Sequence, residues 1–130
     1  MAYRIIGAAI AGVVLALQPA EAAWLQCSAS GGSATGPTGF YTTLVDVGAT
    51  PPDRIAALQQ RLTVYAQHYD PSLTAVQARC VSFDDQSEAA SQYSRVLDGE
   101  RRRLGWEHIV VVQPSDWLPA KEIVSDPYMP

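Results

Sequence analysis

The chain has 130 residues, of which 48% are hydrophobic and 17% charged, the ordinary composition of a globular protein. Its formal net charge of -4 argues against a general nucleic-acid binder, because such proteins carry an excess of basic residues. The sequence shows no repeat of solenoid period. We therefore expect one small domain, with no nucleic acid among its partners.

Residues 1–22 have the features of a secretory signal peptide. Arg4 supplies a positive charge, residues 5–17 form an apolar run, and Ala20-Glu21-Ala22 is a small-x-small cleavage site. The alternative is a membrane anchor, but the run is shorter than the ~20 residues that span a bilayer. The pattern predicts cleavage before Ala23 and export to the periplasm or the medium, with no transmembrane segment in the mature chain.

Both cysteines, Cys27 and Cys80, lie in the exported part, where an oxidising compartment favours disulfides. Gln26 precedes Cys27, whereas a lipidated cysteine follows a small residue. The two cysteines are too far apart for a Cys-x-x-Cys redox motif. We predict a Cys27–Cys80 disulfide that stabilises the fold by about 3–4 kcal/mol, with two free thiols or a reactive cysteine as the alternatives.

Two strands and a long helix are predicted in the first half of the mature chain. The strands span residues 24–29 and 40–47, the second being rich in aromatic and β-branched residues. Residues 30–39 are a run of Gly, Ser, Thr and Pro that predicts a flexible loop. A helix follows from Pro51, capped by Thr50, and its apolar stripe indicates that it is amphipathic.

The second half repeats this order with a strand at residues 73–83, a helix and a strand at residues 108–113. Asp85 is the expected N-cap of the helix, with Glu88 reaching back in a capping box. Gly105 suits the left-handed exit from its last turn. The almost continuous apolar run of the last strand is typical of a well-covered position.

These elements predict a small α+β or α/β domain over residues 23–113, a two-layer sandwich of about four strands with two helices on one face. Cys27 and Cys80 would then bridge neighbouring strands. The other face of the sheet would be bare, and we expect the proline-rich, extended tail at residues 114–130 to cover it with Trp117 and Leu118. The alternative is that the tail, or the face it leaves exposed, docks onto a partner protein.

No motif for a nucleophile, a phosphate loop, a calcium loop or a metal cluster is present, so no catalytic residue, metal or cofactor is predicted. The sharpest charge cluster is Arg101, Arg102 and Arg103, in the last turn of the second helix. These arginines are candidates for contact with an anion or a partner. The alternative is a solvated helix end, because consecutive helical positions fan around the axis.

Two stretches share one pattern, a strand followed by an amphipathic helix. They are FYTTLVDVGATPPDRIAALQQRL (residues 40–62) and ARCVSFDDQSEAASQYSRVLDGERRRLGWEHIVVV (residues 78–112). They cover most of the mature chain and resemble the sporulation-related repeat (SPOR) domain. That resemblance implies a ferredoxin-like βαβ-βαβ module that binds peptidoglycan glycan strands, with Tyr41 and Thr43 as the sugar-binding positions on an exposed sheet surface.

Three functions are therefore kept in view. The leading hypothesis is a non-enzymatic protein-interaction module of the cell envelope or the secreted fraction, with an unknown protein as partner. The second is a domain that binds peptidoglycan or another carbohydrate, as the SPOR-like pattern implies. The third is a small hydrolase or redox enzyme.

Overall fold

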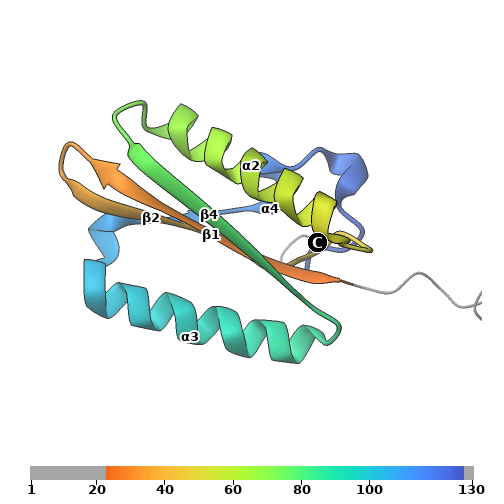
Figure 1. Cartoon of the computed structure of the whole chain (residues 1–130). Helices are drawn as coiled ribbons and strands as arrows, with labels where there is room; N and C mark the ends of the chain where they lie inside the picture. Colours follow the sequence, from red (N-terminus) through yellow and green to blue (C-terminus); the bar gives the residue numbers. More distant parts are fainter. Residues whose placement is uncertain (1–22, 128–130) are drawn as a thin grey trace, which may run out of the picture.

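The computed structural model describes residues 23–127 and places a five-stranded sheet between two long helices (Figure 1). The predicted signal peptide, residues 1–22, lies outside the described residues. The elements follow in the order β1 (Trp24–Ser33), β2 (Gly36–Thr42), β3 (Val45–Asp46), α2 (Pro52–Tyr69), β4 (Thr74–Phe83), α3 (Gln86–Leu104), η1 (Trp106–His108), β5 (Ile109–Val112), α4 (Pro114–Trp117) and η2 (Ala120–Glu122).

Strand β1 is central and runs antiparallel to β4 on one side and to β2 and β3 on the other. Strand β2 then pairs in parallel with β5. A bulge separates β2 from β3, because between the pairs Ser28–Tyr41 and Leu25–Val45 strand β1 advances by three residues and its partner by four. Strands β2 and β3 thus pair with β1 as one strand that is interrupted by this bulge.

The mixed α/β class and the disulfide are confirmed, but the placement of both helices on one face is wrong. Helix α2 lies on one side of the sheet and α3 on the other (Figure 1). The cause is the strand order. The chain crosses β1 in one direction from β2 to β4 through α2, and crosses back from β4 to β5 through α3. Right-handed crossovers in opposite directions put their helices on opposite faces.

The Gly- and Ser-rich stretch at residues 30–39, predicted as a loop, is mostly strand. Strand β1 continues to Ser33 and β2 begins at Gly36, so only Ala34 and Thr35 form the turn. In this region β1 pairs with β2 on one side and β4 on the other. Hydrogen bonds on both sides offset the conformational entropy that the glycines lose on folding.

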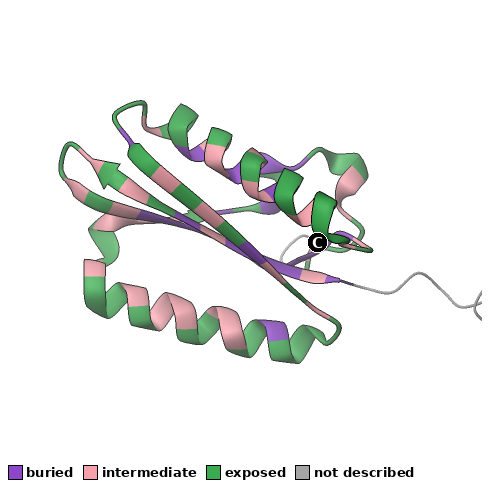
Figure 2. Cartoon of the chain, in the orientation of Figure 1, coloured by how far each residue is buried: buried purple, intermediate pink, exposed green. Residues whose placement is uncertain are grey.

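The two sides of the sheet differ in composition. Alternate residues of β1, such as Leu25 and Cys27, are fully buried in the hydrophobic core on the α2 side. The intervening residues, such as Gln26 and Ser28, are polar and face α3. Figure 2 shows a buried stripe along α2, whereas α3 has one buried residue, Ala89. The α2 layer is therefore the core, and the α3 layer is more open.

The tail packs against the domain, as expected, but on the α2 side and in two short helices rather than extended. Trp117 and Leu118 are each 5% exposed and belong to the core. Glu122 forms ion pairs with Arg61 at 2.7 Å and Arg54 at 3.8 Å, both on α2. Each face of the sheet already carries a helix, so no face is bare. The tail instead covers the part of the α2-side face that α2 does not cover.

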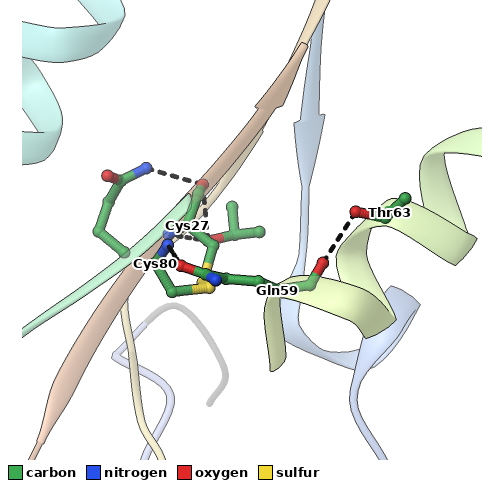
Figure 3. The surroundings of a disulfide bond; sticks show 6 residues. Cys27, Gln59, Thr63 and Cys80 are labelled. Atoms are coloured by element: carbon green, nitrogen blue, oxygen red, sulfur yellow. Dashed lines mark hydrogen bonds between the residues drawn. A yellow bond between two sulfur atoms is a disulfide. The ribbon is translucent and has the colours of Figure 1, made fainter. Parts of the chain in front are cut away.

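The predicted disulfide joins β1 to its neighbour β4 (Figure 3). The Cys27 N–H donates to the hydroxyl of Thr42 at 2.9 Å, and that hydroxyl donates to the Cys27 carbonyl at 3.2 Å. Cys27 and Cys80 are therefore a non-hydrogen-bonded pair, in which strands come close, and their Cα atoms lie 4.1 Å apart. At the open edge of β4, the side-chain oxygen of Gln59 accepts from the Cys80 N–H at 3.0 Å. Gln59 thus shields an edge that could pair with another strand.

Candidate binding site

Two cavities lie between α3 and the sheet, one of about 420 Å³ and one of about 250 Å³. Both are lined by Ser28, Arg79 and Val96, so they are consecutive parts of one groove, the α3 groove. The larger part is within the size range of small-molecule sites. The polar residues that line the groove are Gln26, Ser28, Ser30, Tyr41, Gln77, Arg79, Gln92, Glu100 and Arg103.

Strand pairing explains why polar groups gather in the α3 groove. Ser28 lies opposite Arg79 on the neighbouring strand, and Ser30 lies opposite Gln77. Side chains alternate between the faces of a sheet, so these two cross-strand pairs are presented side by side to α3. The groove floor is therefore a ladder of hydroxyl, amide and guanidinium groups.

Tyr41 is the aromatic member of the groove and is only 4% exposed. Its ring lies over Gly39, where an added Cβ would stand 2.5 Å from the Tyr41 hydroxyl. Burial raises the pKa of the phenol, and its neighbour and hydrogen-bond partner Glu100 raises it further, while Arg103 acts in the opposite direction. The hydroxyl is thus a neutral donor held at the wall of the groove.

Arg79 gives the α3 groove its net charge. Arg103 contacts Glu100 through Nη2 at 2.6 Å and Nε at 3.1 Å, so these opposite charges neutralise each other. Arg79 is exposed, and within residues 23–127 its guanidinium has no ion pair or hydrogen bond. The protein carries a net charge of -4, yet this groove carries one uncompensated positive charge.

The arginine cluster does not converge on one point. Arg103 lines the α3 groove, whereas Arg101 lines a separate hollow. Arg101 contacts Asp98 at 2.6 Å, and Arg102, whose side chain is 70% exposed, pairs with the same carboxylate. The structure therefore brings Tyr41 and Arg103 together in one site and leaves Arg102 in solvent.

The separate hollow, of about 370 Å³, adjoins Trp106 and is called the Trp106 hollow. It is lined by Ala90, Tyr93, Ser94, Leu97, Asp98, Arg101 and Trp106. Trp106 is 56% exposed, which is unusual for a residue of its size. The sequence analysis did not single out this residue.

The positions that the SPOR resemblance suggested are not on an exposed surface. Tyr41 and Thr43 are 4% and 6% exposed, and the Thr43 hydroxyl is buried without a hydrogen-bond partner among the described residues. Tyr41 reaches a cavity wall and Thr43 lines none of the cavities described above. The sequence analysis missed Arg79 and Gln77, although polar residues alternating along two strands were a readable signal.

Within residues 23–127, no three His, Cys, Asp or Glu side chains are grouped in a way that could hold a metal. None of the described helices has both the length and the apolar character of a membrane span. No protein-family model, curated protein or solved structure matches this chain. The chemistry of the described residues is therefore the basis for any proposal about function.

Proposed function

We propose that the protein is an exported, non-enzymatic binding module that engages its partner with the α3 side of the sheet. The supporting observation is the asymmetry of the two layers. The α2 layer and the tail form a filled core, whereas the α3 groove and the Trp106 hollow both border α3. The carboxylate in the α3 groove, Glu100, is held by Arg103, and no histidine is among the residues that line the groove.

The first candidate partner is another protein of the envelope or the secreted fraction. Trp106 supports this candidate because it is a large aromatic side chain exposed beside a hollow, and tryptophan is enriched at the centres of protein interfaces. Tyr93 and Leu97 add apolar area to the same hollow.

The second candidate partner is a glycan, such as the strands of peptidoglycan. The α3 groove supports it, because amide, hydroxyl and guanidinium groups along a groove match the hydroxyl groups of a sugar chain. Val81 and Val96 supply its small apolar surface.

Matched surface variants separate the two candidates. The mature protein is incubated with purified peptidoglycan sacculi and, separately, used as bait for envelope proteins. A glycan partner predicts that Arg79→Gln weakens sedimentation with sacculi and Trp106→Ser does not. A protein partner predicts the reverse pattern for capture. Val124→Ser is the control, because Val124 is 67% exposed and lies in the tail. If neither variant differs from this control, the proposal is rejected.

A further inference from the structure

We propose that the α3 groove binds a linear saccharide that carries a carboxylate, and that Arg79 recognises this carboxylate. This inference rests on the second candidate function, a glycan partner, and names the chemistry of that glycan. It is carried by the position of Arg79 and by the shape of the groove.

The shape of the groove favours a chain over a compact molecule. The two cavities meet at Ser28, Arg79 and Val96, so a ligand that fills both must pass these residues. The larger cavity, of about 420 Å³, and the smaller one, of about 250 Å³, offer successive positions along one line between α3 and the sheet. A linear oligosaccharide has this form.

The lining of the groove suits a hydroxylated ligand. Ser28, Ser30 and Gln77 contribute hydroxyl and amide groups to the larger cavity, and Gln26 and Gln92 contribute amides to the smaller one. Hydroxyls and amides both donate and accept hydrogen bonds, as sugar hydroxyls do.

The charge of the groove favours an acidic group on that ligand. Arg79 stands where the cavities meet, and its guanidinium has no partner within residues 23–127. The other arginine of the groove, Arg103, is occupied by Glu100. A planar guanidinium with free donors matches a carboxylate in a two-point contact. The Tyr41 hydroxyl lies in the wall of the larger cavity.

The test compares two probes with the same sugar chain, one carrying free carboxylates and the other carrying neutral methyl esters. Binding of trigalacturonic acid and of its methyl ester to the mature protein is measured by calorimetry at low ionic strength. The acid is expected to bind at least tenfold more tightly than the ester. The variant Arg79→Gln is expected to bind the acid no better than the ester. Lys121→Gln makes the same charge change at an exposed residue of η2, which pairs with α2 on the opposite face, and is expected to change nothing.

Three results would overturn the inference. If the ester binds as tightly as the acid, the acidic-sugar inference fails while a glycan partner still stands. If neither probe binds, and sacculi do not bind either, the glycan candidate fails with it. If hexaglutamate binds as tightly as trigalacturonic acid, the groove recognises acidic peptides instead. Arg79→Lys, which keeps the charge but loses the planar fork, is expected to bind the acid with intermediate affinity.

Discussion

Ala75 is the only non-glycine residue with a positive φ among residues 23–127, at 53°. It lies in a second bulge, because between the pairs Ser30–Gln77 and Gly32–Thr74 strand β4 has one residue more than β1. Bulges of this kind commonly place glycine in the left-handed region, where a Cβ costs about 1–2 kcal/mol. The side chain of Ala75 is exposed, so nothing else depends on it.

Ala75→Gly is therefore expected to stabilise the protein by about 0.5–1 kcal/mol, since the relief of strain exceeds the added entropy of the unfolded chain. Urea denaturation measures the change. Ala56→Gly, at an exposed position inside α2, is the control and should destabilise by about 1 kcal/mol. Equal losses in both variants would show that Ala75 is not strained.

Tyr41 predicts a dependence of stability on alkaline pH. Its pKa is raised in the folded state by burial and by Glu100, so the folded protein keeps a proton that the unfolded chain loses near pH 10. The free energy of unfolding should then fall as pH rises above 10, by up to about 1.4 kcal/mol per pH unit for this group. Burial also raises the pKa of Tyr65 and contributes in the same direction.

Tyr41→Phe should reduce this slope, measured by denaturation at several pH values between 9 and about 11. Tyr69→Phe is the matched control, because the Tyr69 side chain is 58% exposed. An unchanged slope in Tyr41→Phe would contradict the buried, neutral phenol.

Asp46 contacts Ala23, the predicted first residue of the mature chain. Its carboxylate is buried and accepts from the backbone N–H of Ala23 at 3.1 Å and of Gly48 at 2.9 Å. If the signal peptide is removed before Ala23, this N–H becomes an α-ammonium beside a carboxylate, and hydrogen bonds between charged groups are stronger than neutral ones.

Asp46→Asn keeps an acceptor but loses the charge. Its cost in free energy of unfolding is expected to be larger, by about 1 kcal/mol or more, in a chain that begins at Ala23 than in the same chain with an acetylated N-terminus. N-terminal sequencing of native material establishes the true start. Equal costs in the two chains would show that no such ion pair forms.

At the scale of elements, local sequence signals predicted a helix end correctly where the residues at that end supply the capping groups. The Asp85 carboxylate accepts from the Ser87 N–H at 3.0 Å, and Gly105 ends α3 with φ 82°, as predicted, but within residues 23–127 the predicted return bond from Glu88 does not form. Helix α2 begins one residue later than expected, with Pro51 as N-cap and no side-chain cap. Two successive prolines have no N–H groups to cap, so Thr50 has little to contribute there.

The features that the sequence did not predict depend on pairing between segments that are far apart in the chain. Residues 30–39 look like a loop because glycine and serine favour loops, but partners on both sides hold them in a hairpin. Helix placement depended on strand order, which local patterns do not contain. The α3 groove could not be predicted for the same reason, because Ser28 and Arg79 become neighbours only when β1 pairs with β4.

The tail is an element that the core requires. Leu118 is 5% exposed and packs in the core beside α2. Leu118→Ala is expected to lower the free energy of unfolding by about 2–5 kcal/mol, the usual cost of a cavity in a packed core. Val124→Ala, in the same tail but 67% exposed, should change it by less than about 0.5 kcal/mol. A loss confined to Val124→Ala, measured in urea, would mean that the tail packs differently.

At the scale of the whole molecule, one covalent bond ties the first half of the chain to the second. The disulfide joins residues separated by 53 positions and ties the central strand β1 to the edge strand β4. Helix α2 and both strands β2 and β3 lie inside the closed loop. Constraining a loop of this length in the unfolded chain stabilises the fold by about 4 kcal/mol on the chain-entropy model.

A domain of this size has a total stability of about 5–15 kcal/mol, so loss of the bond should leave it marginal. The double variant Cys27→Ala/Cys80→Ala, or reduction of the wild type with dithiothreitol, is expected to lower the free energy of unfolding by about 4 kcal/mol. Dithiothreitol should have no effect on the double variant, which is the control.

Mass measurement of the unreduced mature chain should find it two hydrogens lighter than the reduced form. The open α3 layer adds little burial of its own, so we predict that this fold depends on the disulfide and therefore on an oxidising compartment, as export by the predicted signal peptide would supply. Equal stability with and without the bond would contradict that dependence.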